Sequence, residues 1–96
     1  LDPKSIKELC FSLSDQIDNL FIVLLSINDN KVFISCFISK TLVENKGISA
    51  SEMIKLLSPL INGTGGGQTF YATGGGTKIK GISDVISKSL EIAIQI

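Results

Sequence analysis

Apolar residues recur at spacings of three and four in three parts of the chain, which is the period of an amphipathic helix. The first helix should follow Asp2-Pro3, where an N-cap carboxylate precedes a proline at the first helical position, and should run to about Asp18. The second should begin at residues 49–52, whose Ser-Ala-Ser-Glu sequence matches a capping box, and Pro59 should end or kink it. A third should begin at about residues 78–81.

Two further apolar runs predict strands that form a hairpin. Residues 21–27 are apolar except for Ser26, residues 32–38 are largely apolar, and Asn28-Asp29-Asn30 connects them. Because only a strand covered by helices hides apolar residues on both faces, the first strand should be central in the sheet. A short third strand is expected at residues 68–73. The order α-β-β-α-glycine loop-β-α indicates the α/β class, as a small single domain with helices packed against a mixed β-sheet.

The length and composition are those of one folded domain. Ninety-six residues are enough for a single core and too few for two, and 44% of them are hydrophobic. No apolar run approaches the roughly 18 residues that a membrane helix requires. The chain starts at Leu1, with neither a methionine nor a signal segment, so we expect it to be an excised fragment of a longer protein.

The charged and sulfur-containing residues restrict the possible chemistry. Nine lysines balance nine acidic residues and arginine is absent, so any contact with a polyanion should be local and modest. Cys10 lies on an apolar helix stripe and Cys36 within an apolar strand, so we expect both to be small core residues in a reducing, cytoplasmic setting. Without histidine, the chain lacks the ligands for a zinc site and the base for histidine-dependent nucleophilic catalysis.

Residues 62–76 hold seven of the nine glycines. A backbone this bare favours close approach to a phosphate or to another backbone, whereas packing alone would not favour so many glycines. A flexible linker is disfavoured because residues 68–73, between the glycine triplets, are strand-like and aromatic. A P-loop is excluded because Gln68-Thr69 stands where its lysine should be. A dinucleotide fingerprint is excluded because residues 63–65 follow a helix and enter a strand.

The two glycine triplets should lie together at one end of the sheet, near Lys40 or Lys78. The second triplet, residues 74–76, precedes the last predicted helix, whose free N–H groups and dipole favour an anion. Lys78 and Lys80 would lie beside that anion, although they could equally form a solvated helix face. Because alternate strand positions point to opposite faces, Phe70 or Tyr71 is expected to be a core residue rather than a platform on which bases stack.

Several of these features together carry a family resemblance. They are the apolar run at residues 21–25, the hairpin through Lys31-Val32, Ser39-Lys40 at the strand end, and the glycine segments at residues 63–68 and 72–76. In order and spacing the chain resembles the C-terminal C-Ala region of alanyl-tRNA synthetase, which belongs to the DHH-associated domain superfamily.

The resemblance implies that residues 1–96 form the globular C-Ala domain of a longer synthetase. Such a domain is non-catalytic and docks the outer corner of tRNA-Ala, where the D and T loops meet, in support of the editing and aminoacylation domains of the same chain. The tRNA-binding residues that it implies are Lys40, Gly65, Gly66, Gly67, Gln68, Gly74, Gly75, Gly76, Lys78 and Lys80.

The resemblance also sets expectations for cofactors and partners. The domain itself should need no cofactor, whereas the parent enzyme would use ATP, magnesium and zinc in its other domains. A homodimer is a further expected partner, and a membrane is not.

The chain departs from the family pattern at two places. Many members follow the third glycine with a basic residue, Pro and Asp, where this chain has Gln68-Thr69-Phe70, and Tyr71-Ala72-Thr73-Gly74 replaces Met-Ala-x-Ala. Gln68 can still donate to a phosphate or ribose oxygen. Two alternatives are the substrate-binding lobe of a DHH phosphoesterase and an oligomerisation module. The phosphoesterase version usually carries a histidine after its glycines, and this chain has none.

Overall fold

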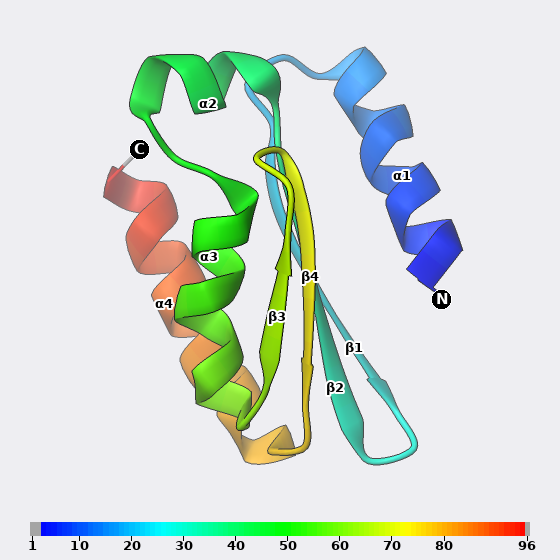
Figure 1. Cartoon of the computed structure of the whole chain (residues 1–96). Helices are drawn as coiled ribbons and strands as arrows, with labels where there is room; N and C mark the ends of the chain where they lie inside the picture. The colour runs from blue at the N-terminus through cyan, green and yellow to red at the C-terminus, as the bar shows by residue number, and fades with distance from the viewer. Residues whose placement is uncertain (1–2, 96) are drawn as a thin grey trace.

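The computed structural model describes residues 3–95, in which helices cover both faces of a four-stranded sheet (Figure 1). The Asp2 N-cap expected from the sequence lies outside the described residues. None of the described helices is long and apolar enough to cross a membrane. The elements, with η marking 3₁₀ turns, are α1 Pro3–Gln16, β1 Phe21–Asn28, β2 Lys31–Ile38, α2 Lys40–Lys46, α3 Ala50–Leu57, η1 Ser58–Ile61, β3 Thr64–Gly67, β4 Tyr71–Gly76, η2 Ile79–Gly81 and α4 Ile82–Gln95.

The α/β class is confirmed, with one correction to the sheet. The strand order is β1-β2-β4-β3, and each neighbouring pair is antiparallel, so the sheet is not mixed. After the helical segment that connects them, β3 runs in the same direction as β2. However, β4 lies between these two strands, so no parallel pair forms among the described strands.

The prediction that residues 21–27 form the central strand is wrong. β1 is an edge strand whose residues are all half-buried or exposed, whereas β2 pairs on both sides and holds Val32, Ile34, Cys36 and Ile38 at full burial. β1 is apolar on both faces because helices cover both faces of the sheet beside it. The apolar content of residues 21–27 therefore correctly indicated that helices cover both faces of this strand, but it did not indicate that the strand lies at the edge of the sheet.

The two faces of the sheet carry two separate cores. The larger core lies between the sheet and α3, η1 and α4, on the left in Figure 1, and includes Ile34, Ile54 and Val85. The smaller core lies under α1 on the other face, where Ile6 and Cys10 pack against Phe37. α1 covers only part of its face, since Phe33 at the far end of the same face is 39% exposed. The smaller core therefore leaves open surface beside α1.

Several local predictions are confirmed. The Ser49 side chain accepts a hydrogen bond from the Glu52 backbone N–H at 3.2 Å, as in a capping box, and α3 ends before Pro59 with a 3₁₀ turn following. The β1–β2 hairpin turns at Asp29 and Asn30, both at positive φ, which suits a two-residue loop.

One helix was not predicted. Residues 40–46, where the sequence pattern predicts no helix, form α2, which ends at Gly47 in the left-handed conformation with φ of 65°. With seven residues, α2 is too short to show a clear helical period in the sequence. Its position matters because it carries Lys40 to one end of the sheet.

Candidate functional site

The two glycine triplets lie side by side in neighbouring strands. Gly65 is paired with Gly74, Gly66 with Thr73, and Gly67 with Ala72. Their predicted proximity is confirmed, but the glycines form the strands β3 and β4 rather than loops at one end of the sheet. The predicted strand at residues 68–73 is instead a turn followed by the first half of β4.

Most of these glycines permit close packing inside the domain. A Cβ added to Gly74 would lie 2.4 Å from Ser58 Oγ, and one added to Gly65 would lie 2.7 Å from Ile54 Cγ2. At Gly76 the added atom would lie 2.2 Å from the Ile61 carbonyl oxygen. The hairpin thus lies directly against α3 and η1, where no side chain would fit between the backbones. The lack of a side chain at these three glycines therefore serves packing against the domain's own helix and turn, while Gly65 remains exposed at the edge of the sheet and its part in a recognition surface stays a prediction.

Gly66 and Gly75 face the other side of the sheet. Among the described residues, nothing lies within 4 Å of a Cβ built on Gly66. A Cβ on Gly75 would make ordinary contact with the Phe33 ring, at 3.5 Å. Of the predicted glycines, Gly66 is therefore the one at which a side chain would meet open space, although its neighbours Gly65 and Gly67 in the edge strand β3 are more exposed.

Gly66 borders a groove between α1 and the β3–β4 hairpin. The groove has a volume of about 220 Å³ and is also lined by Gly67, Gln68 and Lys7. The Lys7 ammonium lies 5.7 Å from the centre of the Tyr71 ring, within cation–π range. Here a cation, an aromatic ring and a bare backbone lie together.

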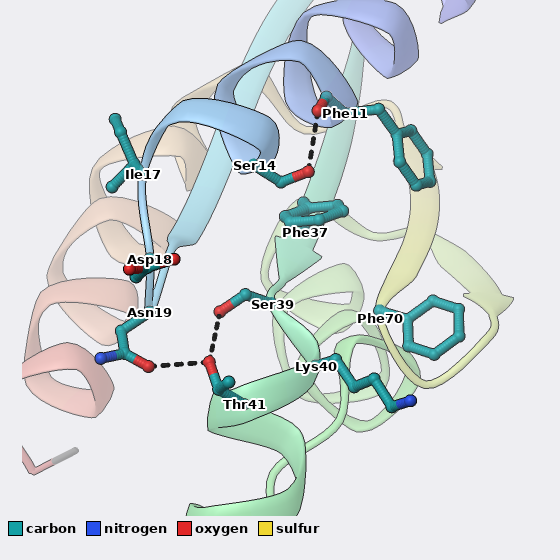
Figure 2. Close-up of a pocket in the computed structure, with 10 residues that line it drawn as sticks. All are labelled: Phe11, Ser14, Ile17, Asp18, Asn19, Phe37, Ser39, Lys40, Thr41 and Phe70. Carbon is teal, nitrogen blue, oxygen red and sulfur yellow. Dashed lines mark hydrogen bonds between the residues drawn. The ribbon is translucent and has the colours of Figure 1, made fainter.

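A second, larger hollow continues from this groove and shares Phe11 and Phe70 with it. Its volume is about 370 Å³, and it opens between α1, the β3–β4 turn and the start of α2 (Figure 2). Thr41 Oγ1 donates a 2.7 Å hydrogen bond to Asn19 Oδ1, which ties the α1–β1 connection to α2. Lys40 and Phe70 lie on one side of the hollow.

Four aromatic residues line the two hollows, and we define them as the aromatic face: Phe11, Phe37, Phe70 and Tyr71. These are four of the six aromatic residues in the chain. The Phe11 ring meets Phe37 edge to face at 5.3 Å between centroids and lies 6.1 Å from Tyr71. Phe37 is buried, as expected of a core residue, whereas Phe11 and Phe70 are 42% and 40% exposed. The prediction that Phe70 or Tyr71 is core therefore holds better for the half-buried Tyr71 than for Phe70.

The predicted lysines are divided between the two ends of β4. Lys40 lies near the β3–β4 turn, because the Ile38 N–H just before it donates to the Phe70 carbonyl at 2.9 Å. Lys78 follows the opposite end, where its own N–H and that of Thr77 donate to the Ile61 carbonyl, each at 2.9 Å. Lys80 lies in η2, which separates the second triplet from α4.

The anion site expected at the start of the last helix is corrected by this geometry. The N–H groups that directly follow the second triplet, those of Thr77 and Lys78, are bonded to the Ile61 carbonyl, Gly76 packs against the same carbonyl, and η2 separates the triplet from α4. Lys78 and Lys80 therefore do not join Lys40, Gly66 and Gln68 on the aromatic face.

Sequence reasoning missed Lys7, Phe11 and Asn19 as members of this surface. A signal was present, because Phe11 lies beside the apolar stripe of α1 and four residues after Lys7, so both side chains point the same way. Asn19, at φ of 56°, holds a left-handed conformation that asparagine tolerates, but its position beside Thr41 depends on the fold.

The buried thiols form no part of the surface. Cys10 and Cys36 are both fully buried, which confirms that they are core residues, and both are free. Burial raises the pKa of Cys10, and burial together with the nearby Cys10 raises the pKa of Cys36 to about 12. Both thiols are therefore protonated and unreactive at neutral pH.

Comparison with known proteins identifies the fold described above. The DHHA1 domain family matches residues 1–95. The chain belongs to that family. Its structure superposes on the C-Ala domain of Aquifex aeolicus alanyl-tRNA synthetase with a TM-score of 0.84 over 96% of this chain and 81% of the other, at 22% sequence identity. This similarity shows that the DHHA1 domain has the C-Ala fold.

Curated relatives of this DHHA1 domain are alanine–tRNA ligases. The protein from Christiangramia forsetii is 40% identical over 89 residues, which are 93% of this chain and 10% of the relative. The protein from Cytophaga hutchinsonii is 43% identical over 88 residues, or 92% of this chain and 10% of the relative. The chain thus spans about a tenth of the length of the curated relatives that it matches.

Proposed function

We propose that residues 1–96 are the tRNA-binding C-Ala domain of an alanine–tRNA ligase and dock the outer corner of tRNA-Ala. The observation that carries the proposal is the aromatic face of this DHHA1 domain, which joins the bare backbone of Gly66 to Lys7 and Lys40. Aromatic rings can stack with nucleic-acid bases while neighbouring lysines contact the phosphates. The relatives reported above favour this function over that of a phosphoesterase lobe.

The proposed surface retains part of the set implied by the resemblance. Lys40, Gly66, Gly67 and Gln68 lie on it. The exposed side chain of Lys40 makes only a 4.0 Å ion pair with Glu44, which costs little to break when a phosphate replaces the carboxylate. Glycine N–H groups and the Gln68 amide supply neutral contacts to phosphates and 2′-hydroxyls, so docking depends on RNA shape more than on charge.

The domain's role in the parent enzyme follows from this proposal. It holds one tRNA while the other domains carry out aminoacylation and editing, with ATP, magnesium and zinc bound there rather than here. The work takes place in the cytoplasm, which suits two free buried thiols. The isolated domain should neither aminoacylate nor deacylate tRNA.

The test is a titration of the 96-residue chain with tRNA-Ala and with other tRNAs, using Gly66→Leu as the variant. A side chain at this open position should leave folding intact but hold the RNA away, and so weaken binding at least several-fold. Lys31→Ala, at the β1–β2 turn, is the control and should bind like the unaltered chain. An equal loss in both variants would show that the surface is misplaced, and no binding by the unaltered chain would refute the function.

A second candidate, homodimerisation, is favoured by a different surface. The apolar groove between edge strand β1 and α4 is lined by Val23, Leu25 and Leu90, the last of them 59% exposed. No described strand pairs with the outer edge of β1, and such an edge can accept a second chain. Sedimentation at several concentrations would detect the dimer, and Leu90→Lys should abolish it.

A further inference from the structure

We propose that the larger hollow accepts one unpaired nucleobase, which stacks on Phe70 while Lys40 contacts the phosphate of the same nucleotide. The inference rests on the proposed function and adds to it a site for a single base. It predicts that the domain recognises an RNA corner by capturing a base as well as by fitting its backbone.

Phe70 is exposed although the backbone around it is fixed. Its carbonyl accepts the Ile38 N–H at 2.9 Å, and the Gln68 N–H closes the turn onto the Tyr71 carbonyl at 2.8 Å. The ring nevertheless remains 40% exposed, and so forgoes part of the stabilisation that burial of phenylalanine provides. An accessible ring on a fixed backbone is suited to stacking because little backbone freedom is lost when a flat ligand covers it.

The hollow has the size and the polarity for a base. Its volume of about 370 Å³ lies within the range of small-molecule sites, and its apolar lining consists of Ile17 and the rings of Phe11, Phe37 and Phe70. Polar groups lie across from Phe70, namely the Ser39 hydroxyl and the Asn19 amide (Figure 2). Because Asn19 Oδ1 accepts from Thr41, the amide nitrogen keeps both of its hydrogens for another acceptor.

The charges around the hollow orient the nucleotide. Lys40 lies on the same side as Phe70, whereas Asp18 lies across the hollow from them (Figure 2). A phosphate is attracted to the lysine side and repelled from the carboxylate side. The base then enters beside Phe70 with its phosphate outside, next to Lys40. A purely apolar peptide carries no charge that could interact with Lys40 or Asp18, so these charges favour a nucleotide over such a peptide.

Two substitutions of Phe70 test the inference, with binding of tRNA-Ala as the readout. Phe70→Leu removes the aromatic ring from an exposed position and should weaken binding about 5- to 100-fold without changing its salt dependence, because stacking involves no counterion release. Phe33→Leu is the matched control, since Phe33 is 39% exposed at the far end of the same sheet face. Thermal unfolding of each variant checks that the fold is kept.

Phe70→Trp supplies a direct signal, because the natural chain contains no tryptophan. The fluorescence of the introduced indole should be quenched when tRNA-Ala binds, and 2-aminopurine placed at unpaired positions of the tRNA loops should identify the captured base. The inference is overturned if the unaltered chain binds tRNA-Ala but Phe70→Leu binds equally well, or if the indole is not quenched; the proposed function would then stand. Equal losses from Phe70→Leu and Phe33→Leu would also overturn it.

Discussion

Glycine has two different roles within a few residues of this chain. Gly76 lies against the Ile61 carbonyl and Gly74 against Ser58, so these positions hold the hairpin on its helix. Gly66, paired with Thr73, faces open space on the other side of the sheet. The alternation follows from the strand geometry, in which successive residues point to opposite faces. At the residue scale, some glycines of this segment therefore allow close packing inside the domain, whereas Gly66 forms part of its surface.

This division predicts opposite outcomes for two alanine substitutions. Gly76→Ala should lower the free energy of unfolding by about 1–3 kcal/mol, because the new Cβ meets backbone that cannot move aside easily. Gly66→Ala should change it by no more than about 0.5 kcal/mol. Urea unfolding followed by circular dichroism measures both. Similar losses in the two variants would contradict the assignment of faces.

The buried thiol of Cys36 predicts a loss of stability at alkaline pH. Its pKa is raised from 9.0 to about 12 in the folded chain, so the thiol ionises first in the unfolded state. The contribution is fully present below pH 9 and is lost as pH rises toward 12, at about 1.4 kcal/mol per pH unit.

Urea unfolding between pH 7 and 10 measures this effect, with Cys36→Ala as the comparison. Other groups titrate equally in both proteins, so the alanine variant should lose less stability over this range. Parallel pH profiles for the two proteins would show that Cys36 is not the group responsible.

At the scale of elements, the α3 segment supports the hairpin because its ends are firmly defined. Ser49 caps its start, Pro59 ends it, and the 3₁₀ turn that follows carries Ile61 under Gly76. A shift in either end would therefore move the packing partner of β4. α1, in contrast, packs against the sheet through the smaller core. The aromatic face therefore lies where the contact between a helix and the sheet is less extensive.

Removal of the α3 cap should destabilise the whole domain. Ser49→Ala deletes the acceptor of the Glu52 N–H bond and should cost about 1 kcal/mol in the free energy of unfolding. Ser87→Ala, an exposed position within α4, is the control and should be neutral or slightly stabilising, since alanine favours helix. A cost at Ser87 equal to that at Ser49 would argue against the capping role.

At the scale of the whole molecule, the charge balance limits how the domain would hold RNA under the proposed function. With zero net charge and no arginine, few phosphates can be neutralised at once. The fold further divides the available lysines, because Lys40 lies by the β3–β4 turn and Lys78 at the other end of β4. Binding by the proposed surface must therefore rely on shape and stacking.

The salt dependence of tRNA-Ala binding should accordingly be shallow. The slope of log affinity against log salt is expected at about −1 to −3, as one to four phosphates are neutralised. Lys40→Ala should reduce its magnitude by roughly one, whereas Lys78→Ala should leave it unchanged. A slope steeper than about −6, or equal effects of the two lysines, would show that another, more basic surface is used.

The sequence by itself determined the features that depend on neighbours along the chain. The capping residues of α3, its end before Pro59, the β1–β2 hairpin and the core positions of both cysteines were all predicted correctly. These signals come from residues within a few positions of each other, where helix and strand periods fix which side chains share a face.

Only the tertiary structure decided which strands pair and what each surface residue meets. The edge position of β1 and the insertion of β4 beside β2 join segments far apart in the sequence, and no local period encodes such a choice. The same long-range pairing turns Gly74 toward Ser58 and brings Phe11 to Phe37. The many glycines indicated that the backbone lies close to another group. Only the packed sheet determined that, for most of them, this group belongs to the domain's own helix and turn.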